Sequence, residues 1–180
     1  MNPATLKEAL LGYTASIEDR KKGSDLIKNK PELEAELIAL CFSKNQKREN
    51  IMASWVLERL ILIEKHIYLH KYIDEFLKAL QNQKHESKRR PFAKLLYNYC
   101  VNEEYRSLLE KKQIDLIVDF CFSTLLEAKK IAPKAFALKT IIFFKYHEEW
   151  IKTELSSFIE QELPRTSPGL KATVRQILPI

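Results

Sequence analysis

Apolar side chains recur along this chain at intervals of three and four residues, the spacing of an amphipathic α-helix. The strongest run covers residues 134–147, where Phe136, Ala137, Ile141 and Phe144 fall on one side of a predicted helix. Weaker copies of this run precede and follow it. Each copy comes after another apolar helix and a polar, basic turn, so the pattern predicts a chain of helical hairpins.

An alanine lies at the centre of each predicted second helix. Successive alanines are 40, 44 and 35 residues apart, at Ala53, Ala93, Ala137 and Ala172. A methyl side chain lets a neighbouring helix approach closely, which gives the repeated alanine a physical reason. The first helices of the four pairs are expected over residues 33–40, 72–80, 116–125 and 155–163.

The amino-terminal part follows a different pattern. Thr5 and Glu8 have the spacing of a capping box, which predicts a helix from there to about residue 17. The charged stretch after it, and then Gly23 and Ser24, are expected to end this helical region. Pro31 suits the first position of the next helix, because its missing N–H would be unbonded there anyway.

Residues 31–178 resemble the HEAT-like branch of the armadillo-type α-solenoids. The most family-like segments are Arg90–Ala93 and Lys134–Ala137, where a basic residue precedes the small residue by three positions. Asn50 and Gly169 stand at that position in the first and fourth copies. The resemblance implies an all-α superhelix of about four helical hairpins behind the N-terminal helix, and the alternative is an irregular helical bundle.

Composition agrees with a helical fold. The 180 residues include only three Gly and seven Pro, and charged residues of both signs make up 30% of the chain. We expect one domain over residues 1–180, in which residues 1–30 form a helical cap and residues 31–178 form the hairpins. The net charge of +6 makes an acidic partner such as nucleic acid plausible without requiring one.

The cysteines and the amino terminus give information on the cellular compartment of the protein. Cys41, Cys100 and Cys121 are far apart and flanked by apolar residues, so we expect buried free thiols in a reducing environment. The first residues lack the pattern of a signal peptide, and no apolar run reaches the length of about 20 residues that spans a bilayer. The sequence therefore predicts a cytoplasmic protein with no membrane partner.

Basic residues gather in the turns that connect the two helices of each hairpin. If the hairpins stack in register, these turns and the adjoining helix amino termini form a cationic edge that can bind phosphates or an acidic protein. The alternative is that exposed turns simply collect Lys and Arg. The predicted basic ridge consists of Lys44, Lys47, Arg48, Lys84, Lys88, Arg89, Arg90, Lys129, Lys130, Lys134, Arg165 and Lys171.

A second candidate surface is the concave face, which the outward sides of the second helices are expected to line. Its polar candidates are Arg59, Lys94, Asn98, Lys139 and Lys145.

Catalytic and metal-binding patterns are weak. HEAT-like alkylpurine DNA glycosylases share the implied architecture, but they need a carboxylate beside aromatic rings, and the second helices carry almost no acid beyond Glu58. Trp55 is expected in the core. His66, His70 and Asp74 have a spacing that can hold a metal, but a predicted turn interrupts them. We therefore expect no cofactor and no metal, and the sequence leans against an enzyme.

Two functions follow from these patterns. The leading hypothesis is a non-enzymatic helical-repeat scaffold that binds another protein. The alternative is a nucleic-acid-binding protein that uses the basic ridge, with or without a relation to DNA alkylation repair. The oligomeric state is expected to be a monomer or a dimer.

Overall fold

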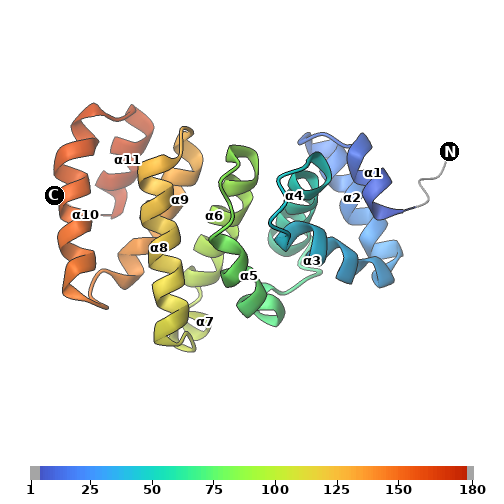
Figure 1. Ribbon diagram of the computed structural model, residues 1–180, viewed down its shortest axis with the longest axis horizontal. Coiled ribbons are helices and arrows are strands. Elements are labelled where there is room, and N and C mark those ends of the chain that lie inside the picture. Colours follow the sequence, from blue (N-terminus) through green and yellow to red (C-terminus); the bar gives the residue numbers. More distant parts are fainter. Residues whose placement is uncertain (1–4, 178–180) are drawn as a thin grey trace. The chain divides into compact units, whose positions relative to one another are not determined.

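The computed structural model describes residues 5–177 and their side chains, apart from the side chains of Leu163 and Ile177. Within this range every regular element is a helix (Figure 1). Two compact units make up the chain, residues 1–95 and residues 96–180, and helix α6 contributes to both. Each unit is built from paired helices, as the apolar pattern predicted.

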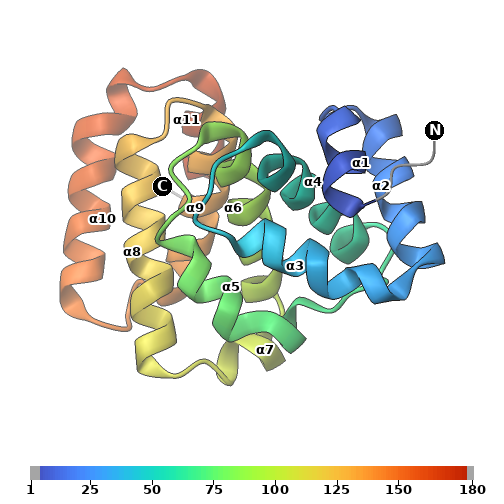
Figure 2. The same cartoon turned by 45° about the vertical axis from the view of Figure 1, so that its right-hand side comes forward.

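The first unit is organised around α4, which packs against α1, α2 and α3 (Figure 2). The helix α4 carries Ala53 and Leu57, both fully buried. The elements of this unit are α1 (Leu6–Gly12), α2 (Ile17–Asn29), η1 (Pro31–Leu33), α3 (Glu34–Phe42), α4 (Arg48–Leu62), η2 (Leu69–Tyr72), α5 (Ile73–Leu80) and the first part of α6 (Glu86–Val101).

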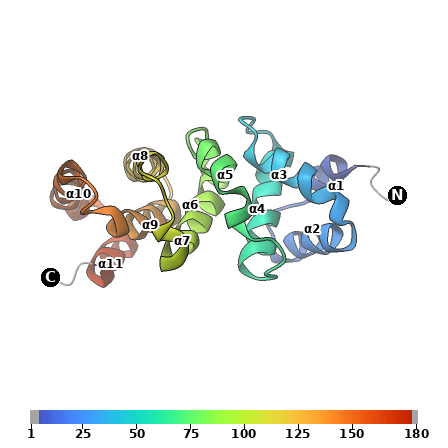
Figure 3. The same cartoon turned by 90° about the horizontal axis from the view of Figure 1, so that it is seen from below.

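The second unit has two layers of helices, with α8 and α10 on one side and α9 and α11 on the other (Figure 3). The helix α9 packs against both α8 and α11. The elements of this unit are the last part of α6, α7 (Glu103–Ser107), α8 (Lys111–Glu127), α9 (Ile131–Ile141), η3 (Ile142–Phe144), α10 (Glu149–Glu162), η4 (Leu163–Arg165) and α11 (Pro168–Ile177).

The amino-terminal prediction was wrong in detail. The capping box at Thr5 is present, but α1 ends at Gly12 and a second helix, α2, begins at Ile17. The side chain of Ser16 caps α2 by accepting from the Asp19 backbone N–H at 3.1 Å. Two helices are therefore present where one was expected, because the side chain of Ser16 caps the start of a second helix.

Gly23 does not end a helix but lies inside α2. A Cβ atom at this position would lie 2.4 Å from a methyl carbon of Val56 on α4. Ser24, next to it, satisfies its hydroxyl by donating to the Lys21 carbonyl at 2.9 Å. The glycine thus permits a close approach of α2 and α4. In the sequence alone, a glycine with this role cannot be distinguished from one that ends a helix.

The predicted burial of the repeated alanine is confirmed in three hairpins and is wrong in the fourth. Ala53, Ala93 and Ala137 are at most 1% exposed in α4, α6 and α9. Ala172 is exposed. The inward stripe of α11 consists of Leu170, Thr173 and Val174. Leu170 and Val174, four positions apart, set the buried face, and this places the alanine outside it.

The apolar run at residues 134–147 is not one continuous α-helix. The helix α9 ends at Ile141 and tightens into the 3₁₀ turn η3. Phe144 is buried, as the apolar spacing predicted, and the neighbouring Phe143 is 39% exposed. The predicted inward position of Phe144 is therefore retained although the segment changes from α-helix to 3₁₀-helix.

The three cysteines are free and buried, as expected. Burial raises the pKa of Cys41 and of Cys100 to about 12. The thiolate is therefore suppressed at neutral pH, which makes these residues core side chains and not nucleophiles.

Candidate functional site

Two surfaces bring aromatic rings and charged groups together, one in each unit. The first, which we name the Trp55 cluster, consists of Arg20, Trp55, Glu58, Arg90 and Lys94. The helices α2, α4 and α6 supply these side chains. The guanidinium carbons of Arg20 and Arg90 lie 5.0 Å and 4.5 Å from the centroid of the Trp55 ring, within range of cation–π attraction.

Glu58 is the anion of the Trp55 cluster. It is only 3% exposed. Its carboxylate accepts from Arg90 Nη1 at 3.2 Å and from Lys94 Nζ at 2.8 Å. The side chains of these two cations are 30% and 28% exposed, so the positive groups reach solvent whereas the negative group does not.

The Trp55 cluster contains three cations and one carboxylate, because Glu58 pairs with Arg90 and Lys94, and Arg20 lies against the Trp55 ring. Desolvation is the main factor that lowers the pKa of Arg20, and Glu58 opposes it. The positive charges of Arg90 and Arg59 lower the pKa further. Such repulsion between like charges is relieved when an additional anion approaches.

Arg59, a predicted concave-face residue, lies beside the Trp55 cluster but has its own partner. Its Nη2 lies 2.7 Å from a carboxylate oxygen of Glu64, which also pairs with Lys28 at 3.1 Å. Of the predicted concave-face residues, Lys94 is therefore the one in the cluster. Trp55 is half-buried at the edge of the core, with both guanidinium groups against its ring.

The expectation that Lys88 and Arg89 occupy an exposed turn is wrong. Both lie in the first turn of α6 and are 0% and 3% exposed. Lys88 Nζ donates to the backbone carbonyl groups of Ser43, at 2.8 Å, and Asn45, at 3.4 Å. Lys88 therefore fastens the preceding hairpin turn. Burial lowers the pKa of its ammonium group.

Arg89 is also engaged internally. Its Nε donates to the Gln83 carbonyl at 2.8 Å, and its guanidinium lies 3.7 Å from Glu86. In the same region Gln46 Nε2 donates to the Asn82 carbonyl at 2.9 Å, which ties the first hairpin turn to the second. Lys88 and Gln46 thus hold these two turns together, and the buried side chains of Lys88 and Arg89 are not exposed for binding.

The other predicted ridge residues reach the surface to different extents. Arg48 is exposed, and it donates to the carbonyl groups of Leu11 and Tyr13 at the end of α1. Arg90 belongs to the Trp55 cluster. Lys134 and Lys171 are half-buried. The exposed remainder consists of Lys44, Lys47, Lys84, Lys129, Lys130 and Arg165. Their alignment along one edge stays a prediction.

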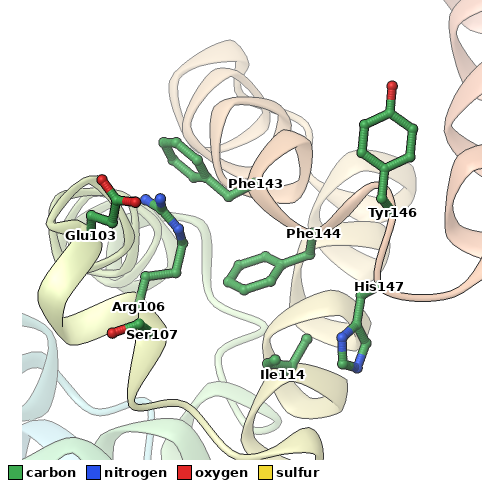
Figure 4. Close-up of a pocket in the computed structure, with 8 residues that line it drawn as sticks. All are labelled: Glu103, Arg106, Ser107, Ile114, Phe143, Phe144, Tyr146 and His147. Atoms are coloured by element: carbon green, nitrogen blue, oxygen red, sulfur yellow. The ribbon is translucent and has the colours of Figure 1, made fainter.

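The second surface, in the second unit, is a pocket of about 400 Å³ (Figure 4). We name it the Phe143 pocket. It lies between α7, α8, η3 and the turn before α10. Phe144 is 4% exposed and lies at its base, whereas Phe143 and Tyr146 are 39% and 77% exposed. Its lining consists of Glu103, Arg106, Ser107, Ile114, Phe143, Phe144, Tyr146 and His147.

Cations lie against the aromatic rings of the second unit as well. The guanidinium carbon of Arg106 is 4.6 Å from the Phe143 centroid, and Lys145 Nζ is 4.8 Å from the Tyr146 centroid. Arg106 Nη1 also donates to the Cys100 carbonyl at 2.6 Å, which fixes the guanidinium in place.

Tyr97 extends this arrangement towards α9. Its ring stacks on Phe143 at 6.5 Å, and Lys139 Nζ lies 5.8 Å from its centroid. Lys139 and Lys145, both predicted for the concave face, therefore lie against aromatic rings, and Asn98 is exposed on α6.

A group of possible metal ligands lies beside the Phe143 pocket. Ligand atoms of Asp115, His147 and Glu148 fall within 4.8 Å of one another. The ammonium of Lys111 already binds both carboxylates, and Trp150 Nε1 donates to Glu148 at 2.9 Å. A hydrogen bond from Lys111 is the main factor that lowers the pKa of Glu148. A lysine thus supplies the positive charge that a metal ion would bring.

The three residues with metal-ligand spacing in the sequence do not share one helix. His66 follows the end of α4, His70 lies in η2 and Asp74 lies in α5. The predicted turn between these three residues, which keeps them from sharing one helix face, is therefore confirmed.

Paired α-helices with small buried residues at a regular spacing define the class of helical-repeat solenoids. The chain matches the HEAT repeat domain family over residues 7–179, and it belongs to that family. Neither the curated proteins nor the solved structures give a significant match. The family and the all-α solenoid fold that the sequence resemblance implied are confirmed, and the matched range also includes α1 and α2.

No helix among residues 5–177 is both long and apolar enough to cross a membrane.

Proposed function

We propose that this chain is a non-catalytic scaffold that binds an acidic segment of a partner protein through the Trp55 cluster. A HEAT repeat fold supports the role of a scaffold, because such solenoids present extended surfaces made of many helices. The observation that carries the proposal is the packing of Arg20 and Arg90 against the Trp55 ring. Beside this ring, an almost fully buried carboxylate pairs with Arg90 and Lys94.

The side chains of the Trp55 cluster suit protein recognition. Trp and Arg are among the residues that contribute most to binding at protein interfaces. Arg90 and Lys94 are held by Glu58, so little side-chain freedom is lost when a partner carboxylate arrives. The excess positive charge speeds the encounter with an acidic segment.

The surroundings of Glu58 support a structural role for this acid. A general base must reach a proton of its substrate, but Glu58 is 3% exposed and accepts from two cations. The carboxylate orients Arg90 and Lys94, and the scaffold is not expected to turn over a substrate. We place this scaffold in the cytoplasm, where its three free thiols would stay reduced.

A labelled oligoglutamate peptide tests the proposal by fluorescence anisotropy at low and at physiological salt. Arg20→Gln removes one cation from the Trp55 cluster and leaves the pairs of Glu58 with Arg90 and Lys94 in place. We expect it to weaken binding by about two- to fivefold, which is the loss of affinity expected when one partly exposed charge pair is removed.

Lys21→Gln is the matched control, because Lys21 is an exposed neighbour on the same helix. This variant makes the same change of charge and should bind the peptide as the wild type does. Equal losses in the two variants would show a general charge effect and would overturn the proposed site.

A second candidate partner is single-stranded nucleic acid. It is favoured by the contact of two guanidinium groups with the Trp55 ring, since aromatic rings and Arg together bind bases and phosphates of single strands. Labelled single-stranded DNA belongs in the same titration. If DNA binds more tightly than oligoglutamate at matched charge, and its affinity falls steeply with salt, the nucleic acid becomes the preferred partner.

A further inference from the structure

The charged groups of the Trp55 cluster do not balance one another. Its three cations are Arg20 on α2 and Arg90 and Lys94 on α6. Its one carboxylate is that of Glu58 on α4. Two positive charges are therefore left for a partner. A carboxylate brings one negative charge, whereas a phosphomonoester brings about 1.5 to 2 near neutral pH, so a phosphate matches the excess more closely.

The neighbouring ion pairs do not change this balance. Arg59 pairs with Glu64 at 2.7 Å. Lys28 pairs with both Glu64, at 3.1 Å, and Asp25, at 2.8 Å. These two cations and two carboxylates cancel each other, so the excess of positive charge belongs to the Trp55 cluster itself.

We propose that the acidic segment bound by the Trp55 cluster carries a phosphorylated serine or threonine, whose phosphate is held by Arg20 and Arg90. The inference rests on the proposed function, because it names the chemistry of the partner at the same site. Phosphorylation of the partner would then control the interaction, since the unmodified segment has too little negative charge to balance the cluster.

Arg20 keeps donors for a phosphate. Its Nε donates to the Ser16 carbonyl at 3.2 Å, and this bond leaves the two terminal nitrogens of the guanidinium for a partner. A planar pair of N–H donors suits two oxygens of one phosphate, which a lysine ammonium cannot match. Because the bond to Ser16 already restricts the side chain, less of its freedom is lost when the phosphate binds.

Arg90 offers a second guanidinium beside the same ring. Its Nη1 donates to Glu58 at 3.2 Å, and its side chain is 30% exposed. The guanidinium carbons of Arg20 and Arg90 lie 5.0 Å and 4.5 Å from the Trp55 centroid, so one aromatic surface anchors both. Desolvation lowers the pKa of Arg20 most, and the charge of Arg90 lowers it further. A dianion that approaches both groups relieves this repulsion.

Three labelled peptides test the inference by fluorescence anisotropy with the full chain. They are acetyl-Glu-Glu-phosphoserine-Glu-Glu-amide, the same peptide with unmodified serine, and acetyl-hexaglutamate-amide, which matches the net charge of the phosphopeptide. We expect the phosphopeptide to bind about fivefold more tightly than hexaglutamate, because its phosphate can accept from both guanidinium groups. The serine peptide should bind more weakly than either.

Arg20→Lys keeps the positive charge of the site but removes the planar pair of donors. We expect it to reduce the preference for the phosphopeptide over hexaglutamate to about twofold, and to leave hexaglutamate binding nearly unchanged. Arg175→Lys is the matched control, because Arg175 is exposed on α11 in the second unit, outside the cluster. It should change neither affinity. Thermal unfolding verifies that both variants are folded.

The pH dependence separates a phosphate from a carboxylate. The second pKa of phosphoserine is about 6, so lowering the pH from about 7.5 to about 5.5 removes most of its second negative charge. Binding of the phosphopeptide should weaken by about threefold over this range. Hexaglutamate should bind with little change, since glutamate carboxylates titrate near pH 4.3.

Two results would refute the inference and leave the proposed function standing. They are equal affinity for the phosphopeptide and hexaglutamate, and a phosphopeptide preference that Arg20→Lys does not reduce. If none of the three peptides binds, the proposed function is wrong as well. Single-stranded DNA of the same net charge is the fourth probe, and tighter binding of the DNA than of the phosphopeptide would make a nucleic acid the partner and refute the inference.

Discussion

The Trp55 cluster and the Phe143 pocket both place cations against aromatic rings, but the buried groups below these rings differ. In the first unit a buried carboxylate, Glu58, ties Arg90 and Lys94 together. In the second unit the base of the surface is apolar, and Arg106 is fixed by a backbone carbonyl. The same helical repeat therefore supports an ionic surface in one unit and an apolar pocket in the other.

The difference has a local origin in the second helices. The helix α4 is continuous from Arg48 to Leu62, so Trp55 and Glu58 lie about one turn apart on it. The helix α9 ends at Ile141 and continues as η3, which carries the exposed Phe143 and the buried Phe144. The aromatic ring of the first surface thus lies within an α-helix, and that of the second lies in a 3₁₀ turn.

The largest contrast between the units is expected at their glycines. Gly23→Ala in the first unit places a methyl group 2.4 Å from Val56, so we expect a loss of about 2 kcal/mol in the free energy of unfolding. Gly169→Ala in the second unit meets its nearest atom at 3.7 Å and should be neutral or stabilising by about 0.5 kcal/mol. Urea unfolding of both variants measures the difference.

A double-mutant cycle with Val56→Ala sharpens this test. If the overlap between the two helices causes the loss, Gly23→Ala should cost clearly less when Val56 is already shortened. An unchanged cost would show that the close approach of α2 and α4 is not the cause.

An intermediate effect is expected for the buried acid. Glu58→Gln leaves Arg90 and Lys94 without their counter-charge, but both can gain water because their side chains are partly exposed. We therefore expect a loss of about 1–2 kcal/mol, below the cost of breaking a fully buried pair. Thermal or urea unfolding measures it, and Glu103→Gln in the second unit, where the acid is exposed, should cost almost nothing.

The same variant also tests binding. Removing the negative charge of Glu58 increases the positive excess of the Trp55 cluster but also frees Arg90 and Lys94. We expect the gain in charge to outweigh the lost orientation, so oligoglutamate should bind Glu58→Gln more tightly than the wild type. Weaker stability together with weaker binding would contradict the assigned role of Glu58 as the internal counter-charge.

The smallest effects concern two partly exposed carboxylates. Hydrogen bonds from the Thr14 hydroxyl and backbone N–H lower the pKa of Asp19 to about 2, whereas a hydrogen bond from Lys111 lowers that of Glu148. Because the folded pKa of Asp19 lies below its ordinary value, its contribution to stability is complete above that ordinary value. The contribution disappears as the pH falls through about 2.

NMR titration separates the two causes. Thr14→Ala should raise the pKa of Asp19 towards 3.8, its ordinary value, and Lys111→Gln should raise that of Glu148. Added salt should raise the pKa of Glu148 more than that of Asp19, since an ammonium pair is screened and a hydroxyl hydrogen bond is not. Equal salt responses would contradict this distinction.

Much of the fold was predictable because its signal is local. The apolar spacing indicated the helix pairs, and the buried Ala53, Ala93 and Ala137 marked three second helices correctly. The error at Ala172 arose because a small residue recurs by chance, while the buried face of α11 is set by Leu170 and Val174. Gly23 was misread because a glycine for close packing and a glycine for a turn look alike in sequence.

The candidate sites were predictable only in part. Arg90, Lys94 and Glu58 stood out in the sequence, but Arg20 did not, since it lies in a segment that was expected to end a helix. Lys88 and Arg89 were predicted for the basic ridge and are buried. The Phe143 pocket gave no sequence signal as a unit, because its lining comes from α7, α8, η3 and a turn.

The sequence by itself determined the helical pairs, their approximate period and the HEAT-like class, since each depends on residues within one or two turns of a helix. Tertiary structure alone decided which charges meet and which are covered. Glu58 and Lys94 are 36 positions apart, and Lys88 reaches the carbonyl of Ser43 from 45 positions away. Contacts of that length depend on how helices pack, and a periodic pattern within one helix does not encode them.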